Sequence, residues 1–229
     1  MKPLLDDFIA PPCHDEIEIL YEDDSLLMIN KPSGLLSLSG KNPLNFDSVH
    51  YRLKKDFPNA TLVHRLDFGT SGIMLVALNK EVNANLTKQF QARTVQKHYI
   101  AFLDGQLVND EGVLDFPISK NKENFPLQKI CFLEGKTAIT HYRVLERFTS
   151  PDITKVEFIP ATGRTHQLRI HSREMGHSIL GCDLYASKDV FNMAKRLMLH
   201  AYSLVFDHPV SGERMTVYSH EAPFTVKES

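Results

Sequence analysis

The sequence is poor in cysteine, and its cysteines are not spaced to bind a metal or to form a redox centre. Cys13, Cys131 and Cys182 are the only three in 229 residues, and no two of them stand at a Cys-x-x-Cys spacing. An odd and scattered set of this kind is typical of reduced thiols in a cytosolic protein. We therefore expect three free thiols and a cytoplasmic location.

Long apolar runs, targeting signals and linkers are also missing. No stretch approaches the roughly 20 apolar residues of a membrane span, and the N-terminus turns acidic at Asp6 and Asp7, too early for a signal peptide. The chain has no Gly/Ser-rich or Pro-rich linker, no internal repeat and no low-complexity tract. We expect no membrane attachment and a single domain over residues 17–229, preceded by an irregular acidic leader over residues 1–16.

Motifs that identify several common enzyme classes are absent. The sequence contains no His-Glu-x-x-His zinc helix, Walker-type phosphate loop, Gly-x-Gly-x-x-Gly fingerprint or Gly-x-Ser-x-Gly elbow. His166 and His171 are five residues apart, so on a helix they would point to different faces and would not share a metal. We therefore expect neither a metal nor a cofactor.

Charge is unevenly distributed along the chain. The formal net charge is -2, but residues 1–24 contain eight acidic residues and one lysine, whereas the rest of the chain contains 25 basic and 20 acidic residues. An acidic N-terminal stretch thus precedes a mildly basic body. Such a body attracts a polyanion only weakly, so a nucleic-acid partner would need a shaped site as well.

The pattern of apolar residues predicts many strands and few helices. We expect strands at about 17–21, 26–29, 73–78, 99–103, 137–147, 153–159, 197–206 and 214–219. Expected helices are one capped by Asp47 or Ser48 and reaching Phe57, one capped by Asn79, one capped by Thr165 and running to about Met175, and a short one at 188–195. Residues 104–136 give no clear pattern. The elements together predict an α+β fold with a mostly antiparallel sheet.

One polar cluster stands immediately before the apolar run 73–78. Residues 63–72 read Val-His-Arg-Leu-Asp-Phe-Gly-Thr-Ser-Gly, with Arg65 two residues before Asp67. A strand covered on both faces would hold this cluster rigidly. A carboxylate held in this way can act as a nucleophile or general base, but Asp67 could equally cap the following turn through its side chain. The residues alone leave both roles open.

Basic residues gather in two further segments. Residues 163–173 contain three arginines, two histidines and no acid, which indicates a phosphate or carboxylate partner. Lys88, Arg93 and Lys97 precede Tyr99, an order that suits a phosphate backbone leading to an aromatic platform. A solvated helix face explains these three charges almost as well.

A family resemblance bears on these alternatives. The string 64–72, His-Arg-Leu-Asp-x-x-Thr-Ser-Gly, resembles the signature of the RluA-type pseudouridine synthases, which isomerise uridine in RNA. Residues 29–34 (Ile-Asn-Lys-Pro-Ser-Gly), 97–99 (Lys-His-Tyr) and 163–169 (Gly-Arg-Thr-His-Gln-Leu-Arg) match the same family in the right order, and 197–201 (Leu-Met-Leu-His-Ala) matches more weakly. The matches span roughly residues 17 to 222. Phe68 and Gly69 depart from the usual residues at two variable spacer positions, which puts little in doubt.

The resemblance implies both a fold and a set of catalytic residues. The fold would be the α+β pseudouridine synthase catalytic fold, a mixed, mostly antiparallel central sheet with the RNA cleft across it. Asp67 would be the nucleophile or base, and Arg169 the cation that opposes its charge. Tyr99 would stack on the uracil and assist removal of its C5 proton, and Arg65 would fill the gap left by the flipped uridine.

The resemblance also implies residues that bind substrate or support the site, and it implies a class of partner. The former are Asn30, Lys31, His64, Arg65, Leu66, Thr70, Ser71, Gly72, Arg164, Thr165, His166, Gln167 and Leu199. Substrate and product are isomers, so no cofactor would be consumed. Short family members modify large-subunit (23S) rRNA, tRNA or both, so an RNA stem-loop is the expected partner. Longer relatives carry an S4-like RNA-binding domain, which we do not expect here, and we expect a monomer without an obligatory protein partner.

Two alternatives belong to other classes of function. A hydrolase could use Ser71 with His64 or His166, but the sequence has no nucleophile elbow and such an enzyme would give Tyr99 no role. An RNA-binding module that has lost catalysis would not need the intact Asp67, Tyr99 and Arg169.

Overall fold

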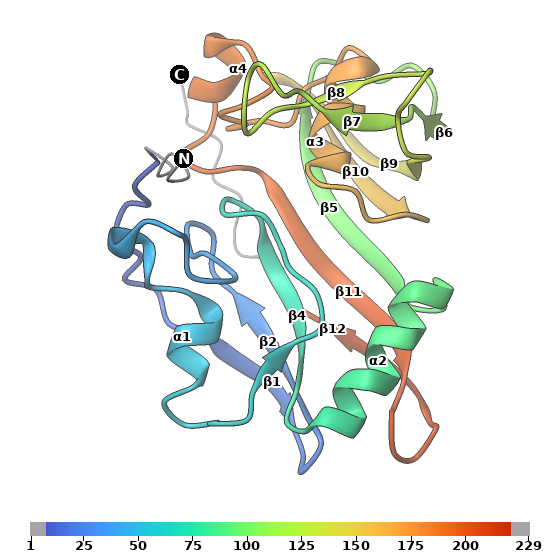
Figure 1. The fold of residues 1–229 in the computed structure, drawn as a ribbon. Coiled ribbons are helices and arrows are strands. Elements are labelled where there is room, and N and C mark those ends of the chain that lie inside the picture. The colour runs from blue at the N-terminus through green and yellow to red at the C-terminus, as the bar shows by residue number, and fades with distance from the viewer. Residues whose placement is uncertain (1–7, 221–229) are drawn as a thin grey trace. The chain divides into compact units, whose positions relative to one another are not determined.

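The computed structural model describes residues 8–220, and this part of the chain forms two compact units (Figure 1). Unit 1 contains the chain up to Val95 together with Leu204–Ser219, and unit 2 contains Gln96–Ser203. Each unit has a hydrophobic core of its own. Whether the chain from residue 17 onward behaves as a single domain stays a prediction, because compactness does not say which part folds alone.

Unit 1 is built on an antiparallel sheet in the order β1-β2-β4, in which β3 also pairs with β4. The strands are β1 (Glu18–Glu22), β2 (Leu26–Lys31), β3 (Thr61–Leu62) and β4 (Ser71–Ala77). The β1-β2 hairpin confirms the predicted pair of strands. All seven residues of β4 are buried, so the apolar run is covered on both faces, as its composition predicted.

Three helices belong to unit 1: the 3-10 helix η1 (Pro43–Asn45), α1 (Val49–Leu53) and α2 (Lys80–Ala92). The side chain of Ser48 caps α1 and that of Asn79 caps α2, both as predicted. The prediction that α1 reaches Phe57 is wrong. After Leu53 the amides of Lys55 and Asp56 bond to carbonyls only three residues back, and the chain leaves the α-helix ahead of Pro58, a residue before which the α conformation is disfavoured.

Unit 2 contains an antiparallel sheet in the order β5-β10-β9-β6. Its strands are β5 (Gln96–Asp104), β6 (Glu111–Asp115), β9 (Ile139–Thr149) and β10 (Asp152–Pro160). Two short strands, β7 (Ile118–Lys120) and β8 (Gln128–Ile130), pair separately as a hairpin. The three strands β6 to β8 fall in the region that gave no clear pattern, because runs of three to five residues are too short to establish an alternation.

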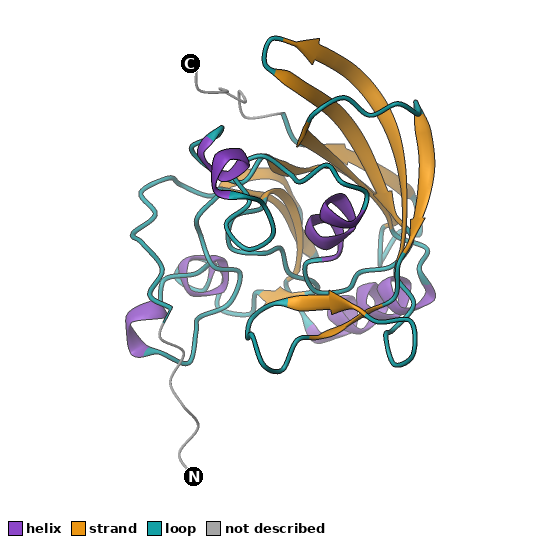
Figure 2. Cartoon of the chain, turned by 90° about the horizontal axis from the view of Figure 1, so that it is seen from above, coloured by secondary structure: helices purple, strands orange, loops and turns teal. Residues whose placement is uncertain are grey.

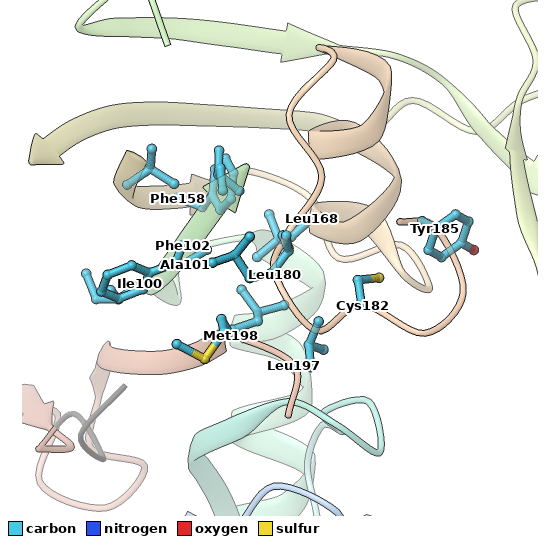
Figure 3. Packing of buried hydrophobic residues seen from close by; sticks show 14 of the residues in the cluster. Ile100, Ala101, Phe102, Phe158, Leu168, Leu180, Cys182, Tyr185, Leu197 and Met198 are labelled. Atoms are coloured by element: carbon cyan, nitrogen blue, oxygen red, sulfur yellow. The ribbon is translucent and has the colours of Figure 1, made fainter. Parts of the chain in front are cut away.

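The helices of unit 2 are α3 (Gln167–Glu174) and α4 (Lys188–Asn192). Leu168 and Ile170 of α3 pack into the core with Phe158 of β10, and Figure 3 shows the loop that carries Cys182 and Tyr185 beside α3. The predicted cap of α3 by Thr165 is wrong. The helix begins after His166, whose backbone has the left-handed conformation and whose side chain makes no capping hydrogen bond.

Two strands complete the described chain. Strand β11 (Leu199–Asp207) passes from unit 2 into unit 1 and pairs with β12 (Arg214–Tyr218). The predominance of strands over helices is evident in Figure 2 and confirms the α+β class. Within residues 8–220 no helix is long and apolar enough to cross a membrane. All three cysteines are free, as expected.

Candidate active site

Asp67 lies in unit 1, on the loop between β3 and β4. It is half-buried, and the following strand β4 is the most completely buried strand of the unit. A hydrogen bond from the Thr70 amide to the Asp67 carbonyl, 3.1 Å long, turns the chain into β4. The carboxylate is therefore carried by a short turn whose backbone is held in one position.

Every backbone carbonyl from residue 66 to residue 69 accepts a hydrogen bond. Ser37 Oγ donates to the Leu66 carbonyl at 2.7 Å, and Ser33 Oγ donates to the Gly69 carbonyl at 2.7 Å. The Phe68 carbonyl accepts from the Gly34 amide at 3.0 Å. Because these three donors come from residues 33–37, the segment after β2 serves as a template for the Asp67 loop.

Lys31 supplies the central bond of this template. Its side chain is fully buried, and Nζ donates to the carbonyls of Pro32 (2.9 Å), Leu35 (2.8 Å) and Phe68 (3.2 Å). Burial lowers the pKa of Lys31 from its usual 10.5 to about 7, and the negative charges of Asp67 and Cys13 partly offset this effect. Lys31 thus joins the segment after β2 to the loop of Asp67 at a cost in desolvation.

The residues after Asp67 have roles that sequence reasoning did not specify. Thr70 and Ser71 are buried at the start of β4. Gly72 pairs with Lys31 across β2 and β4 and has φ +114°, a conformation that an L side chain rarely adopts. These three positions shape the start of β4 and so the direction in which the Asp67 loop enters the strand.

His64, Arg65 and Asn30 surround this framework. His64 Nε2 accepts a hydrogen bond from the Leu75 amide at 3.0 Å, and its ring stacks on Phe90. Arg65 is exposed and makes no hydrogen bond or ion pair within the described residues. Asn30 donates to Glu18 of β1 at 3.0 Å and lies on the opposite face of β2 from Lys31.

Unit 2 contains the two other proposed catalytic residues. Tyr99 lies on β5, opposite Phe158 of β10, and packs against the core of the unit. Arg169 lies on α3 and is 5% exposed. Both residues belong to unit 2, whereas Asp67 belongs to unit 1.

The guanidinium of Arg169 is held by the segment 182–185. Its Nη2 forms an ion pair with Asp183, its Nε donates to Cys182 Sγ at 3.4 Å, and its Cζ lies 5.5 Å from the ring centroid of Tyr185. Three different contacts, two polar and one to an aromatic face, fix its orientation.

Tyr185 links three elements of unit 2. Its hydroxyl is 2.8 Å from His166 Nδ1 and accepts a hydrogen bond from the Gln128 amide of β8 at 2.8 Å. Arg173 lies over the same ring as Arg169, at 5.6 Å. Cys182, Asp183 and Tyr185 were missed by sequence reasoning, because an irregular loop has no periodicity that would mark them.

The side chain of Gln167 holds the turn before α3 through four hydrogen bonds. Its Oε1 accepts from the Arg164 amide (2.9 Å) and from Thr162 Oγ1 (2.7 Å), and its Nε2 donates to the Ile139 carbonyl and to Thr140 Oγ1. The side chain of Gln167 therefore accepts the backbone hydrogen bond at this turn, a role that was predicted for Thr165. Thr165 itself is exposed.

The basic segment 163–173 does not form a single charged face. His171 is completely buried, between Thr140 Oγ1 and the Phe116 carbonyl, and burial lowers its pKa below the usual value. Arg164 Nε donates to the Thr137 carbonyl at 2.9 Å, while Arg169 is held as described above. Leu199, at the start of β11, is a core residue of unit 2.

The chemistry available from these groups is that of carboxylate, guanidinium and phenol. Residues 8–220 contain no cluster of three or more histidine, cysteine, aspartate or glutamate side chains that could hold a metal ion. Asp67 can serve as a nucleophile or base, Arg169 as a fixed cation and Tyr99 as an aromatic surface.

Comparison with known proteins gives the class of this chain, an RNA-modifying isomerase. The family model for RNA pseudouridylate synthase matches residues 25–174, which contain Asp67, Tyr99 and Arg169. The chain is 47% identical over 209 residues to the dual-specificity RNA pseudouridine synthase RluA of Haemophilus ducreyi, covering 90% of this chain and 94% of that protein. It is 44% identical over 206 residues to the protein of the same name from Escherichia coli strain K12, with coverage of 90% and 94%.

The fold agrees with this assignment. The solved structure of human RNA Pseudouridylate Synthase Domain Containing 1 matches with a TM-score of 0.77 and 28% identity, over 96% of this chain and 93% of that one. A second human structure, RNA Pseudouridylate Synthase Domain Containing 4, has the same fold with a TM-score of 0.71. The chain belongs to the RNA pseudouridylate synthase family.

Proposed function

We propose that this protein converts particular uridines of rRNA and tRNA stem-loops into pseudouridines, with Asp67, Tyr99 and Arg169 as its catalytic residues. The observation that carries this proposal is the anchoring of the Asp67 loop, in which every carbonyl from residue 66 to residue 69 is hydrogen-bonded, in a chain of this family. A carboxylate that must reach one bond of one nucleotide needs a backbone that is held in one position.

The reaction is an isomerisation in which atoms and electrons balance within the substrate. The N1 to C1′ bond breaks, the uracil turns, a C5 to C1′ bond forms, and a proton leaves C5 while N1 gains one. Asp67 starts cleavage as nucleophile or base, and Arg169 opposes its charge. Tyr99 stacks on the uracil and assists removal of the C5 proton. No cosubstrate is consumed.

The target uridine must leave the RNA stack before Asp67 can reach its glycosidic bond. Arg65 lies on the same loop two residues before Asp67, is exposed, and makes no hydrogen bond or ion pair within residues 8–220. A planar guanidinium can stack where the base was and hydrogen-bond the neighbours it leaves. We assign this role to Arg65.

The choice of RNA rests on the relatives. Their name, dual-specificity RNA pseudouridine synthase, describes proteins with more than one kind of target. We extend this to the present chain and propose that it modifies both large-subunit rRNA and tRNA. We further propose that it acts as a monomer in the cytoplasm, without an obligatory protein partner.

The proposal is tested with transcripts in which every uridine carries tritium at C5. A tRNA and a fragment of large-subunit rRNA would be incubated separately with the enzyme, and the tritium released to water would be counted. Release with formation of pseudouridine is expected for both RNAs. Cleaved product without tritium release would indicate a hydrolase, and binding without release would indicate an inactive RNA-binding module.

A further inference from the structure

The described part of the acidic leader, residues 8–16, is held firmly against the rest of unit 1 although it forms neither helix nor strand. The buried side chain of Asn45 clamps it at two points. Asn45 Nδ2 donates to the Phe8 carbonyl at 2.7 Å, and Asn45 Oδ1 accepts from the Ala10 amide at 2.8 Å. A short extended segment bound by both ends of one amide has a fixed position and direction.

A second clamp follows a few residues later. Arg52 of α1 donates to the carbonyls of Cys13 (2.5 Å) and Asp15 (2.6 Å), and it is held in place by an ion pair with Asp47. Residues 8–15 are thus attached to η1 and α1 by their backbone. The hydrogen bonds to residues 8–15 are made to the backbone and do not involve the ring of Phe8.

The ring of Phe8 contacts the ring of Phe68. The centroids are 5.4 Å apart and the planes are inclined by 77°, an edge-to-face arrangement that is favourable for two aromatic rings. Phe68 directly follows Asp67, and its carbonyl is already fixed by Lys31 and the Gly34 amide. Phe8 therefore restrains the side chain of a residue whose backbone is fixed independently.

We propose that Phe8 is a positioning residue for Asp67, acting through Phe68. The inference rests on the proposed catalytic role of Asp67 and gives the leader a function in the reaction. Without Phe8, the ring of Phe68 gains freedom next to the carboxylate, while the hydrogen bonds to the loop carbonyls persist. Because Phe8 is 44% exposed, its removal uncovers little apolar surface, so the effect falls on geometry rather than on folding.

The expected size of the effect on the rate follows from the strength of the contact between Phe8 and Phe68. An edge-to-face pair of aromatic rings contributes enough to change a rate about two- to tenfold when it is lost. Phe8→Ala should lower the single-turnover rate of tritium release at saturating enzyme by this factor and leave the dissociation constant for RNA unchanged. Phe8→Tyr retains the ring and should restore most of the rate. If Phe8 had only a structural role, Phe8→Ala would not lower the single-turnover rate while leaving the dissociation constant for RNA unchanged.

A double-mutant cycle tests the route through Phe68. Single-turnover rates would be measured for wild type, Phe8→Ala, Phe68→Ala and the double variant, with Phe46→Ala as the control. Phe46 is an exposed phenylalanine in the same unit, whose described ring contact is with Tyr51. We expect the double variant to be no slower than Phe68→Ala, and the control to match wild type.

Three outcomes would overturn the inference. These are an unchanged rate in Phe8→Ala, a double variant in which the two losses multiply, and a loss confined to RNA affinity. A failure of the proposed function would look different, because wild type itself would release no tritium. Thermal unfolding of each variant verifies that all of them are folded at the assay temperature.

Discussion

The buried ammonium of Lys31 donates a hydrogen bond to the carbonyl of Phe68, 37 residues away along the chain and next to Asp67. This bond joins the segment after β2 to the loop that carries the proposed catalytic carboxylate. It is made by a group whose burial lowers its pKa to about 7. Lys31 therefore couples the geometry of the site to the stability of unit 1.

Lys31→Met gives a stability prediction that depends on pH. Below about pH 7 the folded protein holds a charged and desolvated ammonium, whereas above about pH 10.5 the lysine is neutral in both the folded and the unfolded state. Between these values the unfolded state binds more protons, so the stability of wild type relative to Lys31→Met should rise with pH. Between pH 6.5 and 9.5 the rise should be on the order of 3 kcal/mol.

Urea unfolding of the two proteins at several pH values measures this difference. Both should carry Cys13→Ser, because the negative charge of Cys13 is one of the two charges that act on the pKa of Lys31. Asp67 is the other group that acts on Lys31, and it is present in both proteins. A stability difference that does not vary with pH would show that Lys31 is not buried as described.

Tyr185→Leu should impair the chemical step by misplacing Arg169. The variant removes the aromatic face below the guanidinium, a contact whose loss corresponds to a decrease of about 2- to 30-fold in single-turnover rate. Tyr185→Phe keeps the face and loses the hydroxyl bonds to His166 and Gln128, so its defect should appear mainly as lower thermal stability.

Arg173→Gln is the matched control for this prediction. It removes the other guanidinium over the same ring and leaves Arg169 in place. The control should retain the single-turnover rate at saturating enzyme. Equal rates for Tyr185→Leu and Tyr185→Phe would mean that the aromatic face does not position Arg169.

Arg169→Met should disable the enzyme while unit 2 remains folded. The methionine retains much of the apolar stem but lacks the positive charge that we propose opposes the Asp67 carboxylate in the reaction. It also leaves Asp183 without the guanidinium, a small loss for stability because the carboxylate of Asp183 is 58% exposed. Circular dichroism and tritium release measured on the same sample would separate folding from activity, and a wild-type rate would refute the role of Arg169.

Arg65→Lys tests whether the protein flips its target base. The charge is kept and the planar guanidinium is lost, so the variant should be slower on a structured stem-loop. The deficit should shrink on a loosened RNA in which the target uridine is already unstacked, because extrusion then costs less. An equal loss on both RNAs would indicate a phosphate contact instead.

The strands and helices that follow a local pattern could be predicted from the sequence. The buried run of β4, the β1-β2 hairpin and the Asn79 cap of α2 are all determined by neighbouring residues. The end of α1 and the start of α3 could not be predicted in this way. The first is set by tightening before Pro58 and the second by the side chain of Gln167.

The candidate site was predictable only in part, for the same reason. Motifs identified Asp67, Tyr99 and Arg169 as candidates, but the residues that hold them come from distant segments. Lys31 is fixed by the carbonyls it meets after folding, and Tyr185 lies on a loop without periodicity. The charge pattern also overestimated how many basic side chains of the segment 163–173 are available to a partner, because nothing in the sequence shows that His171 is buried.

The most direct test of the account is tritium release by Asp67→Asn, under single-turnover conditions with a C5-tritiated stem-loop. The amide retains the shape of the side chain but loses its charge and nucleophilicity. We predict no release above the buffer background, with RNA affinity close to that of wild type. Turnover retained by Asp67→Asn would contradict the account, since the anchored loop would then carry a residue that the reaction does not need.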